Sequence, residues 1–173
     1  MTNNTTTTKD FRVFITNLGK YNEGELVGKW LDLPCDDLEE ELASIGVKDG
    51  TRYEEYFITD YENDWNYSVG EYENLTTLND LAEQLAEIND KGDGDWLASY
   101  MEVQGGELED AIEHYEDSAF YPGMTLEDVA HELVEECYDL PEIAQRYFDY
   151  EAFARDLGYD GYTETENGTI CIN

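Results

Sequence analysis

Basic side chains are scarce in this chain, whose 173 residues include 9 Lys and Arg against 43 Asp and Glu, a formal net charge of -34. A chain this acidic repels phosphates, so direct binding of nucleic acid is not expected. Many such chains are disordered because they cannot bury enough apolar surface. Here 40% of the residues are hydrophobic, and 14 Tyr, 6 Phe and 3 Trp supply material for cores. We therefore predict a folded protein whose negative surface binds a basic partner.

Cysteine and histidine are also rare. The cysteines are Cys35, Cys137 and Cys171. They form no CxxC pair, so neither a disulfide framework nor a structural zinc site is expected, and all three are interpreted as ordinary thiols. His114 and His131 lie too far apart for an HExxH metal site. The Asp90–Asp95 segment lacks the glycine and glutamate positions of a calcium-binding loop, so we predict no metal and no cofactor.

Long apolar runs are missing as well. No stretch of about 18 apolar residues is present, so no membrane-spanning helix is expected. The Thr- and Asn-rich start of the chain contains no apolar core of a signal peptide. These patterns predict a cytoplasmic protein in which residues 1–10 form a flexible tail.

Residues 11–73 have the pattern of a small α+β domain. Runs of β-branched and aromatic residues predict strands over 11–17, 29–33 and 54–61. Between the second and third strands, Asp36 or Asp37 is placed to cap a helix.

Residues 74–117 have the pattern of a central helical domain. Apolar residues recur there at helical spacing: Leu75, Leu78, Leu81, Leu85 and Ile88. Thr76 or Thr77 is placed to cap this helix. Two further helical stretches are predicted over 96–103 and 107–117.

Residues 118–173 are predicted to form a second α+β domain that mediates dimerisation. A helix is expected from Thr125, and a helical pattern continues from Pro141 to Leu157. The segment 162–172 is expected to be a hairpin around Asn167-Gly168, a dipeptide that favours a type I′ turn. Four aromatic residues are the candidates for the dimer surface: Tyr147, Phe148, Tyr150 and Phe153. The predicted fold class is therefore α+β, with three small domains.

Negative charge is concentrated toward the C-terminus, where residues 93–173 hold 22 acidic and only two basic side chains. Within a helix over Glu107–Asp117, carboxylates three or four residues apart form one stripe. A solvated helix face explains any one such stripe, but the imbalance recurs along the whole chain. Duplex DNA carries one charge per ~1.7 Å, so 34 charges correspond to about 17 base pairs.

Four stretches of the sequence resemble, in the same order, the ArdA family of antirestriction proteins. They are VFITNLGKYNEGELVGKW (13–30), YEEYFITDY (53–61), ELEDAIEHYED (107–117) and FDYEAFARDL (148–157). The resemblance extends over Phe11–Ile172. It leaves out residues 1–9, and the chain departs from the family pattern at Lys91–Asp95.

The resemblance implies an elongated three-domain protein that forms a homodimer through its C-terminal region. It implies that carboxylates imitate the phosphates of bent B-form DNA and thereby inhibit type I restriction-modification enzymes. Such proteins protect the incoming DNA of mobile genetic elements and have no catalytic residue. The family's antirestriction motif corresponds to Leu97–Asp117. The resemblance therefore places the DNA-mimic carboxylates at Glu107, Glu109, Asp110, Glu113, Glu116 and Asp117.

Two alternatives stay open from the sequence. An acidic scaffold that binds another basic DNA-associated protein, such as a nucleoid protein, fits the same charge. A hydrolase would require at least two carboxylates with raised pKa values in a cleft, and nothing in the sequence singles out such a pair.

Overall fold

The computed structural model describes residues 9–137 and 140–172 of the chain. Its backbone contacts group into two compact units, Met1–Gly94 (unit 1) and Asp95–Asn173 (unit 2). Each unit combines helices with a three-stranded sheet, so the predicted α+β class is confirmed. The division into domains at 11–73, 74–117 and 118–173 stays a prediction. Residues 1–8 of the predicted tail lie outside the described residues.

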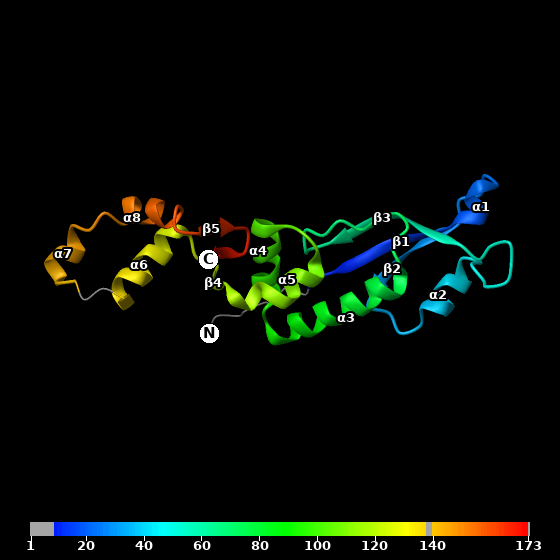
Figure 1. Ribbon diagram of the computed structural model, residues 1–173, viewed down its shortest axis with the longest axis horizontal. Helices are drawn as coiled ribbons and strands as arrows, with labels where there is room; N and C mark the ends of the chain where they lie inside the picture. The colour runs from blue at the N-terminus through cyan, green and yellow to red at the C-terminus, as the bar shows by residue number, and fades with distance from the viewer. Residues whose placement is uncertain (1–8, 138–139, 173) are drawn as a thin grey trace. The chain divides into compact units, whose positions relative to one another are not determined.

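The sheet of unit 1 is built around the first strand. β1 (Phe11–Asn17) lies between β2 (Gly28–Leu33) and β3 (Tyr56–Asn63), and both pairings are antiparallel (Figure 1). The first two strands agree with the sequence prediction to within one residue. β3 begins and ends two residues later than predicted because its pairing with β1 sets its limits, with Asn17 opposite Tyr56 and Phe11 opposite Asn63.

Two short helices flank this sheet. α1 (Leu18–Asn22) was not predicted from the sequence, and the side chain of Asn17 caps it by accepting a hydrogen bond from the Lys20 N–H at 3.0 Å. α2 (Leu38–Ser44) confirms the helix predicted between the second and third strands. Its cap is Asp37, whose carboxylate accepts from a backbone N–H of the first turn at 2.9 Å.

The long helix α3 (Leu75–Lys91) covers one face of the sheet of unit 1 (Figure 1). The predicted apolar stripe is confirmed, because all five of its side chains are buried, as are Val13 and Ile15 of β1. The predicted cap is wrong. Asn74, not a threonine, accepts hydrogen bonds from the N–H groups of both Thr76 and Thr77, at 2.8 and 3.2 Å, so the threonines lie inside the first turn.

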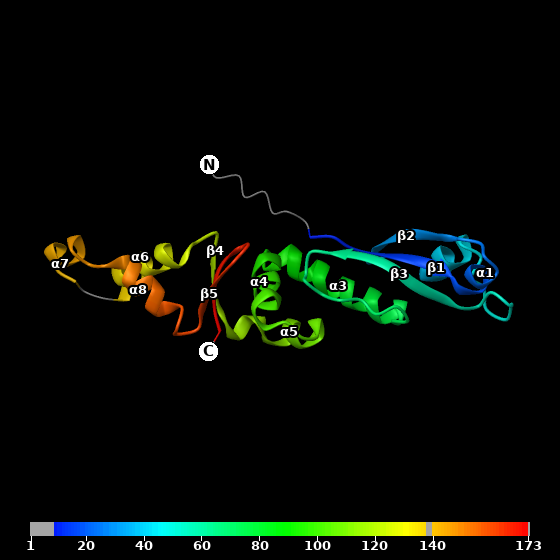
Figure 2. The same ribbon diagram turned by 90° about the horizontal axis from the view of Figure 1, so that it is seen from above.

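The sheet of unit 2 is built around the strand nearest the C-terminus. β6 (Gly168–Cys171) lies between β4 (Ala119–Pro122) and β5 (Tyr162–Thr165), again with antiparallel pairing (Figure 2). The predicted hairpin of β5 and β6 is confirmed. β4 was not predicted, because four residues give too short a pattern.

The predicted type I′ turn of this hairpin is wrong. Thr165 pairs with Gly168, so the two loop residues are Glu166 and Asn167. A type I′ turn needs positive φ at both loop positions, whereas among the described non-glycine residues only Asn66 has a positive φ. Gly168 instead allows a close approach of β4, since a Cβ atom there would lie 2.3 Å from the carbonyl oxygen of Tyr121.

The other elements of unit 2 are helical. They are α4 (Gly94–Gln104), α5 (Leu108–His114), a 3₁₀ turn η1 (Tyr115–Asp117), α6 (Leu126–Cys137), α7 (Glu142–Arg146) and α8 (Tyr150–Leu157). The helix predicted over 107–117 therefore ends early and continues as a 3₁₀ turn, and the helical run predicted from Pro141 is divided into α7 and α8. No helix in the described part of the chain is long and apolar enough to span a membrane.

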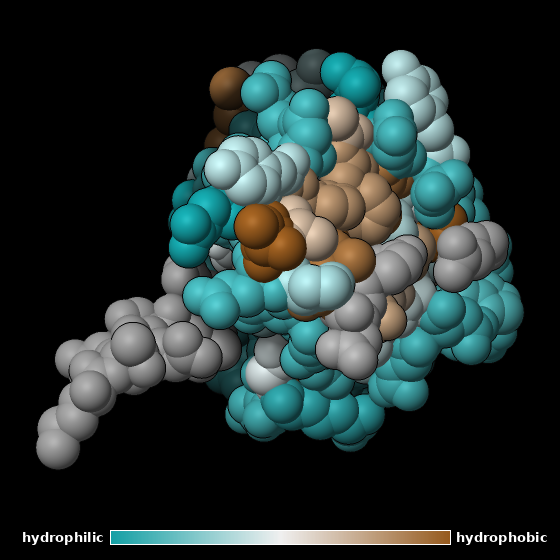
Figure 3. All heavy atoms as spheres, turned by 90° about the vertical axis from the view of Figure 1, so that its left-hand side faces the viewer, coloured by the Kyte–Doolittle hydropathy of each residue, from teal (hydrophilic) through white to brown (hydrophobic). Residues whose placement is uncertain are grey.

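A small apolar core joins α6 and α8. Val129, Ala130, Ala154 and Leu157 are buried there, with Phe153 packed against them. Beside this core, Ile143 in α7 and Tyr147 after it are 70% and 80% exposed. Figure 3 faces this end of unit 2 and shows apolar side chains gathered inside a rim of polar ones.

Candidate functional site

The carboxylates of the described chain all lie at or near the surface. The buried polar side chains are Thr16, Asn17, Asn79, Ser99 and Thr169, with no Asp or Glu of the described residues among them. Burial of an unpaired carboxylate is costly, so the fold keeps this charge in contact with water. The negative charge is therefore available to a partner.

The acidic segment Glu107–Asp117, which comprises α5 and η1, has an inner and an outer side. Leu108, Ala111 and Tyr115 are at most 2% exposed, and their spacing of three and four residues places them on one inward face. The six carboxylates predicted from the family resemblance are all exposed: Glu107, Glu109, Asp110, Glu113, Glu116 and Asp117. The structure thus brings them together on one folded segment; that they bind a partner stays a prediction.

Neutral contacts anchor the acidic segment to α4. The indole N–H of Trp96 donates to Ser118 Oγ at 2.8 Å, and this hydroxyl donates to the carbonyl oxygen of Tyr115 at 2.6 Å. The ring of Trp96 also meets that of Tyr115 edge-on, with centroids 5.3 Å apart, and stacks on Phe120 at 6.4 Å. We call these four residues the Trp96 anchor. Sequence reasoning missed it because Trp96 and Ser118 are far apart in the chain and share no motif.

Two carboxylates of the acidic segment have side-chain partners within it. The Tyr115 hydroxyl donates to Glu116 Oε1 at 3.0 Å, and His114 Nδ1 lies 3.3 Å from Asp117 Oδ2. Like charges at helical spacing destabilise a helix by a few tenths of a kcal/mol per pair. The Trp96 anchor and the buried inner side therefore have to offset the repulsion between the carboxylates.

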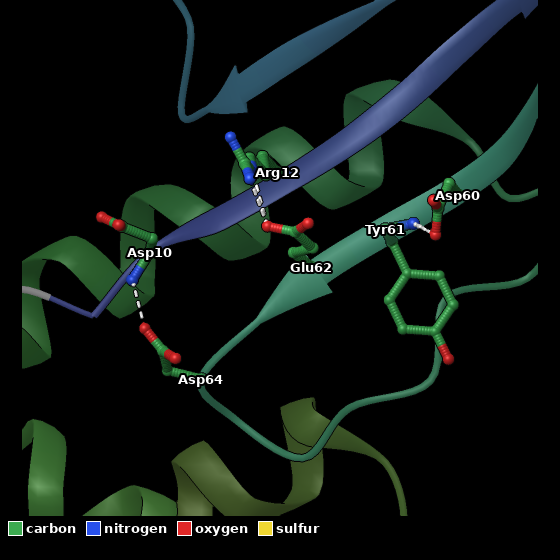
Figure 4. A network of polar contacts seen from close by, with 6 residues as sticks. All are labelled: Asp10, Arg12, Asp60, Tyr61, Glu62 and Asp64. Atoms are coloured by element: carbon green, nitrogen blue, oxygen red, sulfur yellow. Dashed lines mark hydrogen bonds and ion pairs between the residues drawn. The ribbon is translucent and has the colours of Figure 1, made fainter.

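Basic side chains of unit 1 pair with carboxylates. Ion pairs join Arg12 to Glu62, Lys29 to Glu41 and Arg52 to Glu23. The Arg12 Nε–H donates to Glu62 at 2.8 Å across the β1–β3 pairing (Figure 4), and this hydrogen bond raises the pKa of Arg12.

Residues 95–173, by contrast, contain 21 acidic and two basic side chains, the latter Arg146 and Arg155. Unit 2 therefore holds the less compensated part of the charge.

A cavity of about 860 Å³ lies in unit 1, among β1, β3 and α3. Its lining includes Arg12, Glu62, Asp64 and Trp65. The Asp10 N–H donates to the Asp64 carboxylate at 2.8 Å, and Arg12 pairs with Glu62 (Figure 4). Two of the lining carboxylates are thus engaged, Asp64 by a backbone donor and Glu62 by a cation.

Two of the three cysteine thiols and one of the two histidine rings have distinct surroundings. Burial raises the pKa of the Cys35 and Cys171 thiols, which disfavours their reactive thiolate forms. His131 is exposed and stacks on Tyr150 with ring centroids 3.6 Å apart. Within residues 9–137 and 140–172, no group of three or more His, Cys, Asp or Glu side chains could hold a metal ion.

Fold and site together define the class: a small acidic α+β protein that displays carboxylates on anchored, folded segments. The family follows from a sequence comparison. Residues 13–171 match the model of the antirestriction protein (ArdA) family, and the chain belongs to that family. No curated protein matches the chain. The family resemblance inferred from the four sequence stretches is therefore confirmed.

Replacing Ser118 tests the Trp96 anchor. Ser118→Ala is expected to lower the free energy of unfolding by about 1–2 kcal/mol, because the Trp96 N–H loses its acceptor and the Tyr115 carbonyl loses a donor. Urea denaturation followed by tryptophan fluorescence measures this change. Ala119→Ser, at the exposed neighbouring position, is the control and is expected to be nearly neutral. Equal stability of the two variants would show that the hydroxyl does not anchor the segment.

Proposed function

We propose that the protein is a DNA mimic that binds the DNA-binding site of type I restriction-modification enzymes in the cytoplasm and inhibits them without catalysis. It thereby protects the incoming DNA of mobile genetic elements. The observation that carries the proposal is the acidic segment itself, in which six exposed carboxylates stand on a folded element of a chain from the antirestriction family.

Electrostatics gives this proposal its mechanism. A DNA site on an enzyme is a positively charged channel, and much of its affinity comes from neutralising phosphates. Carboxylates displayed at a density comparable to that of DNA phosphates can compete with DNA for the same channel. The Trp96 anchor orders the acidic segment before binding, so less conformational entropy is lost when the complex forms. A disordered acidic chain would have to lose that entropy on binding.

The second candidate function is an acidic scaffold for another basic DNA-associated protein. The net charge of -34 supports it equally well. The two functions differ in the site that is occupied, because only a DNA mimic excludes duplex DNA from a type I enzyme.

Displacement of DNA distinguishes these functions. The purified protein is expected to release a labelled duplex of about 40 base pairs from a type I methyltransferase core with one-to-one competition, and to bind more weakly as salt is raised. Fluorescence anisotropy across a salt series measures both effects. If a panel of such enzymes shows no displacement even at low salt, the DNA-mimic function is wrong and the scaffold function is favoured.

Removal of charge in blocks tests which carboxylates bind. Changing all six carboxylates of the acidic segment to amides is expected to weaken displacement at least tenfold, because their contacts act together. Glu113→Gln alone is expected to change it less than twofold.

The matched control neutralises six exposed carboxylates of α6, α7 and α8: Glu127, Glu135, Glu136, Glu142, Glu151 and Asp156. Both block variants have the same net charge. An equal loss in the two would mean that total charge, rather than the acidic segment, determines binding.

We also propose that the protein is a homodimer through its C-terminal region. Of the four aromatic residues predicted for this surface, Tyr147 is largely exposed, whereas Phe148, Tyr150 and Phe153 are half-buried. The ring of Phe148 contacts those of Tyr150 and Phe153, with centroid distances of 4.9 and 5.6 Å. Tyr147 and the exposed Ile143 are therefore the most accessible large apolar side chains of this region.

A double variant tests the dimer. Ile143→Ser with Tyr147→Ser is expected to raise the dimer dissociation constant at least tenfold, since it removes two large apolar contacts. Sedimentation equilibrium over a concentration series measures this constant. Tyr159→Ser is the control, because Tyr159 is 81% exposed and lies outside α7. A dimer that is unchanged in the double variant would place the interface elsewhere.

A further inference from the structure

Two exposed tyrosine rings of unit 1 flank a buried phenylalanine. Tyr21 of α1 is 48% exposed, and its ring centroid lies 5.1 Å from that of Phe57 in β3. Tyr72, in the loop before α3, is 70% exposed and stacks on the same ring with a centroid distance of 6.4 Å. Phe57 itself is only 4% exposed, so it supports both tyrosines from the core. We call these three residues the aromatic patch.

Backbone hydrogen bonds hold the segments that carry the aromatic patch. The N–H of Ile58, next to Phe57, donates to the carbonyl oxygen of Glu71 at 2.8 Å, which fixes the loop that carries Tyr72. The N–H of Leu18 donates to the carbonyl oxygen of Glu55 at 3.1 Å, which fixes the start of α1. The rings are therefore presented by an ordered backbone, and little ordering is needed when a partner binds.

The charges around the aromatic patch select a cationic partner. Glu55 and Glu71 are exposed, and the hydrogen bonds just described place their backbones beside it. Two cations of this region are engaged at a different ring: Lys20 and Arg52 lie over Tyr53, 5.9 and 4.8 Å from its centroid. The aromatic patch thus combines exposed aromatic faces with neighbouring carboxylates, the two groups that together recognise a guanidinium.

We propose that the aromatic patch binds an arginine side chain on the surface of the same restriction-modification enzyme, a step that rests on the proposed function. A guanidinium can stack on a tyrosine face and donate paired hydrogen bonds to a carboxylate such as that of Glu71. Tyrosine and arginine are both enriched at the centres of protein interfaces. Duplex DNA keeps its aromatic faces stacked inside the helix, so this contact distinguishes the protein from the DNA it displaces.

The test compares two double variants of the full chain. Tyr21→Ser with Tyr72→Ser is expected to weaken duplex displacement about tenfold, whereas Tyr21→Phe with Tyr72→Phe keeps the rings and is expected to stay within about twofold of the unchanged protein. The assay uses the type I methyltransferase core from which the unchanged protein displaces the labelled duplex most effectively. In the serine variant, the slope of displacement affinity against salt concentration is expected to stay the same, because the substitutions remove no charge from this protein.

Controls separate the possible failures. Tyr159→Ser is the control, because it changes an exposed tyrosine of unit 2. The single variant Tyr72→Ser, with its thermal unfolding measured, guards against misfolding.

If the serine double variant displaces DNA as well as the unchanged protein does, the aromatic patch does not bind the enzyme and the proposed function stands. If the phenylalanine variant loses as much as the serine variant, the hydroxyls rather than the ring faces bind, and arginine stacking is wrong. If the unchanged protein displaces DNA from no enzyme, the proposed function fails first.

Discussion

Repulsion between like charges adds to the conformational entropy that folding costs, and it constrains where every residue of this protein can lie. With a formal net charge of -34, the chain folds only because its apolar side chains are buried away from its carboxylates. In unit 1 this burial includes side chains of both β1 and α3, such as Val13 and Leu78, each 0% exposed. In unit 2 it joins α6 to α8, and it also holds the inner side of the acidic segment. Apolar burial thus provides the stability, and it leaves the charge on the outside.

The two units stabilise their surfaces by different means. Unit 1 uses ion pairs, such as that between Arg12 and Glu62, each of which cancels one negative charge. The acidic segment of unit 2 is held by uncharged contacts of Trp96 with Ser118 and Tyr115. An anchor made of ion pairs would neutralise the carboxylates that the proposed function requires. Neutral aromatic and hydroxyl contacts fix the segment while leaving its full charge in place.

Regular patterns in the sequence predicted the parts of the fold that depend on local periodicity. The stripe of α3 could be predicted because five apolar residues follow its helical repeat, and the exposed carboxylates of the acidic segment could be predicted from the family resemblance. α1 and β4 could not, because each is only four or five residues long and is fixed by capping or by strand pairing. The helix cap at Asn74 was missed because neighbouring threonines are also good caps. The Trp96 anchor depends on residues more than 20 positions apart, a relation that no local pattern records.

The order of the strands has a consequence for how the protein is made. The central strand of the first sheet, β1, is synthesised before both of its neighbours, β2 and β3, and all strands and helices of unit 1 have been made once Gly94 has left the ribosome. The central strand of the second sheet is β6, which ends at Cys171. Nearly 50 residues therefore separate the synthesis of β4 from that of β6, the strand with which it pairs in the described part of the chain. Domains generally fold as units during synthesis, the N-terminal one first. Unit 1 can therefore fold while later residues are still being synthesised, whereas the sheet of unit 2 forms only after β6 has emerged.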